Sequence, residues 1–182
     1  LRHLSLYDDI EIPEPPTLFD KWTDNAPGAR QQELEIDRHM DLNYDLFVDL
    51  TPEFHQERSQ KAQDRSAWRN MKRMTPKQIN TWRSHYKPKD AAFKKGKLSG
   101  KDLIRWKFQR YAKNYLRCVK GVDESLHTLQ EELRKLGLDK NTIVIYSSDQ
   151  GFYIGDHGWY DKRWMYEESL KMPLIVKWTG TI

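Results

Sequence analysis

Only one cysteine, Cys118, occurs among the 182 residues, which excludes an internal disulfide framework within this sequence. A single thiol says nothing firm about the compartment in which the protein works. No segment approaches the roughly eighteen consecutive apolar residues of a membrane span. The opening segment LRHLSLYDDIEIPEPP also lacks the basic, apolar and small-residue order of a signal peptide.

What is present is a highly charged chain with enough apolar residues for one packed core: 32% of the residues are charged and 37% are hydrophobic. We therefore expect a soluble domain. Charge is distributed unevenly, because residues 57–120 hold 20 Lys and Arg against 4 Asp and Glu, whereas the remainder holds 11 against 23. A polyanionic partner and an ordinary solvated basic surface are both open as explanations.

The chain does not begin with Met and stops shortly after PLIVKW, a strand-like segment, so we expect an internal fragment of a longer protein. Glu11–Asp20 contains three prolines and is predicted to be an extended connector, with Leu18 and Phe19 docked on a core. Ala29–Phe47 has a weak helical pattern.

A clearer helix is predicted to begin after Thr75. Thr75 can cap the helix, Pro76 suits its first position, and Gln78 completes a capping box. We expect Pro88 to end this element. The Lys- and Gly-rich segment Lys87–Lys101 has no periodicity and is predicted to be a mobile loop.

The strongest periodic signal is a stripe of apolar residues at steps of three and four that ends at Gly137. It predicts one long amphipathic helix, or two helices joined near Gly121, closed by a glycine cap. Cys118 lies beside this stripe, and we expect it to pack in the core. The stripe consists of Ile104, Phe108, Tyr111, Tyr115, Val119, Val122, Leu126, Leu129, Leu133 and Leu136.

Two short strands follow the predicted long helix. Thr142–Tyr146 is continuously apolar or β-branched, which is typical of a central parallel strand covered on both faces. PLIVKW, residues 173–178, is a second strand after a polar segment. Helix, buried strand, polar loop and buried strand together indicate an α/β layered fold, and no internal repeat is present.

The polar segment begins with Asp149 and Gln150 at the carboxyl end of the first strand, where ligands collect in open α/β sheets. Gly151 allows the chain to turn sharply there. A carboxylate beside an amide oxygen offers hard ligands suited to Ca²⁺ or Mg²⁺. Taken alone, the triplet Asp149-Gln150-Gly151 is explained more readily by a side chain that caps the next turn than by a metal site.

The same segment brings His157 and Lys162 into one loop, with Gly155 and Gly158 flanking the histidine. An imidazole can donate to or protonate an oxygen, and an ammonium can neutralise an anionic oxygen as charge develops. Together with an oxygen-ligated metal, these groups suit hydrolysis of a phosphate or sulfate ester. A solvated loop with incidental charges is the alternative.

Three further charged residues of the loop, Asp156, Asp161 and Arg163, are expected to make structural salt bridges or hydrogen bonds rather than to act in catalysis.

At NTIVIYSSDQGFYIGDHGWYDKRWMYEESLKMPLIVKW the chain resembles the C-terminal part of the catalytic domain of type I, formylglycine-dependent sulfatases, in the alkaline phosphatase superfamily. Tyr7–Asp20 and Phe108–Val144 resemble segments that precede this loop in the same proteins. The resemblance points to bacterial-type sulfatases of sulfated polysaccharides, including iduronate- and glucosamine-sulfatase-like proteins. It implies a layered α/β/α domain with a mainly parallel central sheet, of which residues 1–182 are a part.

The resemblance implies a role for four residues. Asp149 and Gln150 would ligate Ca²⁺, with Gln150 in a position where Asn or His is commoner. Lys162 would bind a sulfate oxygen, and His157 would face the substrate or sulfate pocket, which makes both catalytic and substrate-binding candidates.

The family's nucleophile is a formylglycine made from Cys in a Cys-x-Pro/Ala-x-Arg motif, and Cys118, followed by VKGV, does not fit that motif. Asp8 and Asp9 precede the proline connector and do not fit the family's N-terminal metal-binding Asp pair. We therefore expect both features upstream of Leu1, and the fragment alone to be inactive.

The function expected is hydrolysis of a sulfuric ester on a sulfated saccharide, in a periplasmic, secreted or lysosomal protein, with no nucleic-acid partner and no membrane span. A phosphonate or phosphodiester hydrolase of the same superfamily is the alternative enzyme. A non-catalytic module that binds heparin or nucleic acid through residues 57–120 is the alternative of another class. Neither the sugar nor the oligomeric state follows from the sequence.

Overall fold

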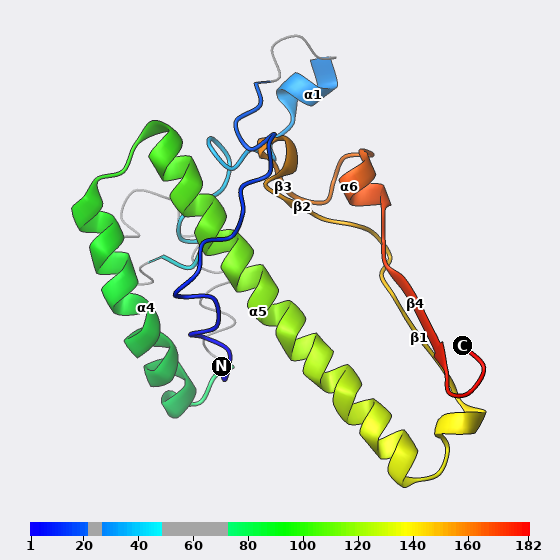
Figure 1. The fold of residues 1–182 in the computed structure, drawn as a ribbon. Helices are drawn as coiled ribbons and strands as arrows, with labels where there is room; N and C mark the ends of the chain where they lie inside the picture. Colours follow the sequence, from blue (N-terminus) through cyan, green and yellow to red (C-terminus); the bar gives the residue numbers. More distant parts are fainter. Residues whose placement is uncertain (22–26, 49–72) are drawn as a thin grey trace.

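The computed structural model describes residues 1–21, 27–48 and 73–182 (Figure 1). Two long helices, α4 (Pro76–Gly96) and α5 (Gly100–Lys135), lie beside one another, and two small sheets lie along α5. None of the helices in these ranges is both long and apolar enough to cross a membrane. The remaining elements are α1 (Pro27–Gln31), η2 (Asp139–Asn141), β1 (Ile143–Ser147), β2 (Tyr153–Ile154), η3 (Asp156–Gly158), β3 (Tyr160–Asp161), α6 (Glu167–Leu170) and β4 (Leu174–Trp178).

Helix α4 begins as the sequence predicts. The Thr75 hydroxyl accepts a hydrogen bond from the backbone N–H of Gln78 at 3.3 Å, and Oε1 of Gln78 accepts one from the Thr75 N–H at 2.8 Å. Pro76 occupies the first turn, where its missing N–H leaves no helical bond unmade. The capping box is therefore confirmed.

The predicted end of this helix at Pro88 is wrong, because α4 continues through Pro88 to Gly96. Most of the predicted loop Lys87–Lys101 is consequently helical. An internal proline costs a helix about 3 kcal/mol. Packing on α5 opposes that cost: the Phe93 ring stacks on Trp106 with centroids 3.8 Å apart, and the hydroxyl of Tyr86 donates to Asn114 at 2.8 Å.

Helix α5 confirms the long amphipathic helix and is a single element of 36 residues, unbroken at Gly121. Gly137, with a φ of 66°, follows its end in the left-handed conformation that favours glycine. The expectation that Cys118 packs in the core is wrong, because its side chain is exposed. Phe108 and Ala112 are buried in the first half of α5, whereas apolar residues of the second half meet few neighbours in the described chain.

Strands β1 and β4 pair antiparallel, with Ile143 opposite Trp178 and Ser147 opposite Leu174. Both strands confirm the sequence prediction by position. The described strands do not show the expected mainly parallel arrangement, nor is β1 covered on both faces, since the Ile145 side chain is 64% exposed. Helix α5 lies along this sheet, and no second layer covers its other face within the described ranges (Figure 1).

Strands β2 and β3 form a short hairpin that residues 34–36 extend on one edge. Glu35 and Trp159 form an antiparallel bridge, and the N–H of Tyr160 donates to the carbonyl of Leu34 at 2.9 Å. The weak helical prediction for Ala29–Phe47 is therefore mostly wrong, since only α1 is helical there. The ammonium of Lys107 donates hydrogen bonds to the backbone carbonyls of Ile36, Asp37 and Met40 at 2.9 to 3.0 Å. These bonds hold the segment in turns, and the helical pattern of its sequence does not reveal them.

The connector lies between α5 and the hairpin, as the blue segment of Figure 1 shows. Leu18 is buried in the main core and Phe19 packs at its edge, which confirms their predicted docking. The backbone of Ile12 accepts from and donates to the side-chain amide of Gln109, at 2.7 and 2.9 Å. Glu14 pairs with Arg105 at 2.9 Å. These bonds hold the connector along α5.

Candidate active site

The polar segment after β1 turns against α6 at Gly151. Its N–H donates to the carbonyl of Ser169 at 2.8 Å. A side chain at Gly151 would collide with the carbonyl oxygens of Glu168 and Lys171, the second of which would lie 2.6 Å from a Cβ atom. Glycine is therefore required at this position to bring the residues just before it close to α6.

Asp149 and Gln150 lie between the end of β1 and this turn. The Asp149 carboxylate is exposed, and its Oδ1 accepts from the Ser148 hydroxyl at 3.3 Å. Gln150 differs, because its amide nitrogen is buried and has no hydrogen-bond partner in the part of the chain described. A buried amide end without a partner is costly, so this end is suited to meeting a group from elsewhere.

These two side chains fit part of a calcium site. Ca²⁺ takes six to eight oxygen ligands, and a carboxylate and an amide oxygen are donors of the required kind. Among residues 1–21, 27–48 and 73–182, no group of three or more His, Cys, Asp or Glu could hold a metal ion. Asp149 and Gln150 would therefore supply a share of the ligands of such a site, with no cluster of three acidic, His or Cys side chains beside them in the described ranges.

The loop that carries His157 has three residues with left-handed backbone. Gly155, His157 and Gly158 have φ angles of 92°, 60° and 70°. At Gly155 a Cβ atom would lie 2.7 Å from the ring of Phe108, so this part of the loop packs directly on α5. The N–H of His157 donates to the hydroxyl of Thr17 at 2.8 Å, which ties the loop to the connector.

The imidazole of His157 is held between two carboxylates. Its Nε2 lies 3.3 Å from Oε2 of Glu168 on α6, and its Nδ1 lies 3.8 Å from Oδ2 of Asp20 on the connector. The rings of Tyr153, Trp159 and Tyr166 surround it at 5.5 to 6.5 Å between centroids. His157 thus joins three segments of the chain, whatever else it does.

One edge of His157 also lines an open groove of about 550 Å³ beside the connector. The groove is lined by four cationic side chains from separate segments, together with acidic side chains, and no local pattern in the sequence predicts that they converge. A bidentate pair with Glu35 holds the guanidinium of Arg38, and this hydrogen bond raises the pKa of Arg38. The cationic residues are Lys21, Arg30, Arg38 and Lys101.

Lys162 follows β3 at the exposed end of the hairpin. Within the described ranges it has no hydrogen bond or ion pair, so its ammonium group is available. The preceding Asp161 has a φ of 71°, and its N–H donates to the Tyr111 hydroxyl at 3.3 Å. Asp161 also pairs with Arg163 at 3.1 Å, a salt bridge of the kind expected of these two residues, while their absence from catalysis stays a prediction.

Beneath this hairpin lies a titratable cluster that sequence reasoning missed. Burial, opposed by a hydrogen bond from the Asp41 N–H and reinforced by the charges of Asp41 and Asp161, raises the pKa of Asp45 to about 6. Burial also raises the pKa of the Tyr111 and Tyr160 hydroxyls, and the negative charges of Asp45 and Asp161 raise it further. These residues come from three distant segments, so no spacing along the chain reveals them.

Helix α5 supports the polar segment through aromatic contacts. The Phe152 ring stacks on Tyr115 at 5.1 Å and on Tyr111 at 6.2 Å between centroids. The structure thus ties the His157 loop and the turn at Gly151 to the same helix face and to α6. Asp149, Gln150 and Lys162 flank this anchored region, with exposed or unpartnered polar ends.

Comparison with known proteins identifies the family to which this chain belongs. Residues 15–182 match the family model described as Sulfatase. The chain therefore belongs to the sulfatase family, and the resemblance drawn from its sequence is confirmed.

Two curated relatives and one solved structure illustrate the match. N-acetylglucosamine-6-O-sulfatase of Bacteroides thetaiotaomicron is 40% identical over 181 residues, which are 100% of this chain and 32% of that protein. An endo-4-O-sulfatase of the same bacterium is 41% identical over 69 residues, 37% of this chain and 14% of that protein.

The solved structure is of a protein in complex with its substrate, D-glucosamine-2-N,6-O-disulfate. It matches 97% of this chain and 35% of its own with a TM-score of 0.85 and 38% identity. The expected α/β fold class is thereby confirmed. The chain spans about a third of the length of the N-acetylglucosamine-6-O-sulfatase and of the protein in the solved structure.

Proposed function

We propose that residues 1–182 are part of the catalytic domain of a sulfuric ester hydrolase that removes sulfate from a sulfated carbohydrate. The observation that carries this proposal is the 40% identity to an N-acetylglucosamine-6-O-sulfatase across the whole chain, the polar segment included. The position of that segment after β1, anchored on α5 and α6, supports it.

In this proposal Asp149 and Gln150 hold part of a calcium site. The Asp149 carboxylate is exposed and can turn an oxygen toward a cation, and the side-chain amide of Gln150 carries an oxygen of the kind that calcium accepts. Bound calcium would neutralise negative charge on a sulfate group, while a formylglycine outside this chain would supply the nucleophile.

Lys162 is proposed to bind a sulfate oxygen. Its unpartnered ammonium, held at the end of the hairpin by the bonds of Asp161, can neutralise charge that develops on that oxygen. His157 is proposed to border the substrate, because it lines the groove beside the connector. Glu168 and Asp20 fix the orientation of this imidazole.

The names of the relatives suggest the first substrates to test. Because one relative is an N-acetylglucosamine-6-O-sulfatase, a sulfated glucosamine is the leading candidate for this protein. The proposal further assigns the full-length protein to a periplasmic, secreted or lysosomal compartment, where sulfated polysaccharides are met. Nucleic acid is not among the proposed partners.

The test measures sulfate release by the full-length protein that contains this chain. We expect release from N-acetylglucosamine-6-sulfate in the presence of Ca²⁺, and its loss on chelation with recovery when Ca²⁺ is restored. A panel of phosphodiesters and phosphonates serves as the control. Faster turnover of those esters than of any sulfate, with dependence on a transition metal, would replace this proposal by the phosphoesterase alternative.

A further inference from the structure

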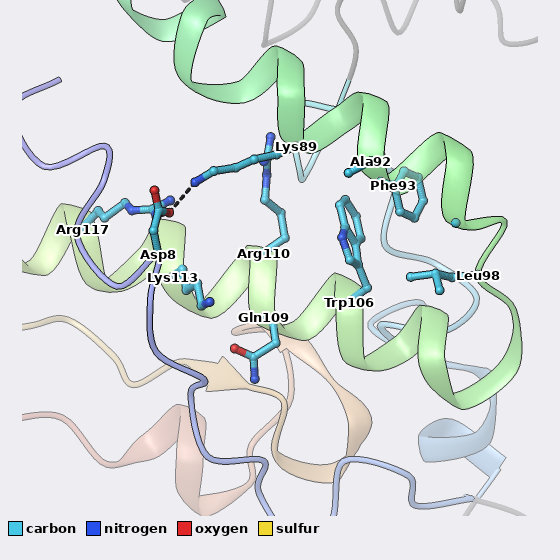
Figure 2. A pocket seen from close by; sticks show the side chains of 11 residues that line it. Asp8, Lys89, Ala92, Phe93, Leu98, Trp106, Gln109, Arg110, Lys113 and Arg117 are labelled. Atoms are coloured by element: carbon cyan, nitrogen blue, oxygen red, sulfur yellow. Dashed lines mark hydrogen bonds and ion pairs between the residues drawn. The ribbon is translucent and has the colours of Figure 1, made fainter.

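A second pocket, of about 460 Å³, lies between α4 and α5 (Figure 2). Figure 2 shows that its charged side chains gather at one end, with Asp8, Lys89 and Arg117, whereas Trp106, Phe93 and Leu98 stand at the other. The pocket belongs to the basic part of the chain, which the roles proposed for the polar segment leave unexplained. Its two unlike ends make it suited to an amphipathic ligand.

The charged end surrounds one carboxylate with several cations. Asp8 pairs with Lys89 and, at 2.7 Å, with Arg117, and His85 lies 3.7 Å away. Burial acts to raise the pKa of Asp8, yet the hydrogen bond from Lys89 and the nearby positive charges lower it overall. Burial lowers the pKa of His85, and the charge of Lys89 lowers it further. The Asp8 carboxylate is therefore ionised, and Lys89 and Arg117 both pair with it.

Positive charge is left over at this end of the pocket. Arg110 is buried, stacks over the Tyr86 ring at 3.9 Å and pairs with Asp90 at 3.3 Å. Lys113 lines the same pocket and has no hydrogen bond or ion pair in the described part of the chain. Lys89, Arg110, Arg117 and Lys113 thus face the two carboxylates of Asp8 and Asp90, and Lys113 is the one of these four cations that makes no ion pair in the described chain.

The other end of the pocket offers a flat apolar surface. The Trp106 indole stacks on Phe93 with ring planes 23° apart, so the two rings form one rigid wall. Leu98 and Ala92 complete it. A wall of this kind packs well against the C–H face of a sugar ring, while the opposite end can bind an anionic substituent of the same ring.

The pocket lies on a different face of α5 from the aromatic contacts of the polar segment. At 100° per residue, Lys113 points about 160° away from Tyr111 and from Tyr115, which carry Phe152. A ligand in the pocket would therefore meet α5 from the side opposite Phe152. One polysaccharide molecule can contact both faces only if it extends around the helix.

We propose that the pocket between α4 and α5 binds an anionic sugar unit of a sulfated polysaccharide, with Lys113 and Arg110 at its acidic group and Trp106 under its ring. The choice of a sulfated sugar rests on the proposed function, whereas the preference for an anion with an apolar face rests on the pocket itself. A nucleic acid fits less well, because its phosphates need cations along an extended surface, and these cations converge on one end of a small pocket.

The experiment measures binding of a heparin hexasaccharide to the full-length protein by calorimetry, for wild type, Lys113→Gln and Lys113→Glu. Lys87→Gln is the matched control, since Lys87 is exposed on the opposite face of α4 and lines no described pocket. We expect Lys113→Gln to weaken binding about three- to tenfold, Lys113→Glu to weaken it more, and Lys87→Gln to change it less than twofold. Thermal unfolding of each variant checks that the fold is retained.

Equal affinities for Lys113→Gln and Lys87→Gln would overturn the proposal, as would failure of the wild type to bind. Tighter binding of a single-stranded DNA oligonucleotide of equal charge than of the hexasaccharide would overturn the choice of a sugar. Because the titration is made with Ca²⁺ chelated, so that no turnover is expected, the pocket and the proposed sulfatase activity can fail separately. A protein that binds through Lys113 yet releases no sulfate would retain this inference and refute the proposed activity.

Discussion

Nε2 of His157 lies 3.3 Å from Oε2 of Glu168, and this contact joins the β2–β3 hairpin to α6. Both side chains are largely shielded from water, with 22% and 28% of their surfaces exposed. The pair closes the polar segment into a loop, since α6 also accepts the hydrogen bond from Gly151 through Ser169. Its loss should loosen the segment that carries Asp149 and Gln150.

The first prediction concerns this pair. Glu168→Ala in the full-length protein should lower the free energy of unfolding by about 1–2 kcal/mol, because it removes one of the two carboxylates that face the shielded imidazole. Glu167→Ala, at the exposed neighbouring position, is the control and should cost less than about 0.5 kcal/mol. Equal denaturation midpoints for the two variants would show that the pair contributes nothing to stability.

The second prediction tests the metal assignment. Asp149→Ala in the full-length protein should abolish sulfate release and weaken Ca²⁺ binding, because the carboxylate supplies charge that the cation needs. Calcium titration by calorimetry gives a readout that does not depend on turnover. Asp156→Ala, which alters another carboxylate of the same segment, is the control. Wild-type calcium affinity in Asp149→Ala would remove Asp149 from the metal site.

The third prediction concerns Lys162. Lys162→Ala should lower kcat/KM by roughly two to three orders of magnitude, the usual scale for the loss of one preorganised charge stabiliser, with little change in stability. Lys162→Arg should restore activity only in part, since a planar guanidinium replaces a compact ammonium. Arg163→Ala serves as the control. Unchanged kinetics in Lys162→Ala would mean that this lysine is only a surface residue.

The fourth prediction follows from the raised pKa of Asp45, about 6 in the folded protein against 3.8 for the unperturbed group. Folding thus favours the protonated carboxyl, so its contribution to stability is full below pH 3.8 and is lost as pH rises through about 6. The Asp45→Asn variant has no carboxyl at this position and does not lose this stabilisation. The difference in free energy of unfolding, variant minus wild type, should therefore increase by about 1–3 kcal/mol between about pH 4 and pH 7.

Denaturant unfolding of both proteins across this pH range is the measurement. Burial also raises the pKa of Asp90 to about 6, but that residue is present in both proteins and cancels in the difference. A stability difference that does not vary with pH would show that Asp45 is ionised in the folded protein at an ordinary pKa.

The fifth prediction concerns residues 1–182 expressed alone. Ile145 and Leu174, on paired strands, are 64% and 71% exposed, and α5 leaves apolar residues uncovered beyond Cys118. A surface of this kind favours association, so we expect aggregation or a partly molten state and no hydrolysis of aryl sulfates at any Ca²⁺ concentration. Sharp two-state thermal unfolding of a monomer would contradict the first expectation, and measurable turnover the second.

Local rules predicted the elements whose signals are local. The capping box at Thr75, the apolar stripe ending at Gly137 and the β-branched run of β1 each lie within a few turns of chain, and the structure places helix ends and a strand there. The predicted helix end at Pro88 is wrong because contacts of α4 with α5 outweigh the cost of an internal proline, and short-range patterns do not contain those contacts. The predicted burial of Cys118 is wrong because an apolar stripe identifies one face of a helix but does not show whether another part of the chain covers it.

The candidate site was predictable in its residue types but not in its surroundings. Asp149, Gln150, His157 and Lys162 stand out within one segment, and their chemical roles stay predictions. The carboxylates that hold His157 come from the connector and α6, at positions 20 and 168. Asp45 lies over a hundred residues from Asp161, whose charge raises its pKa, so only the folded chain brings these groups together.

The connector's contacts also have a consequence for the order of synthesis. Thr17 accepts its hydrogen bond from His157, 140 residues later in the chain, and Ile12 bonds to Gln109, 97 residues later. At ribosomal rates of about 5–20 residues per second, the connector waits on the order of ten seconds for these partners to emerge. During that interval Leu18, buried in the finished fold, stays uncovered on the nascent chain, and slower translation prolongs its exposure to chaperones and proteases.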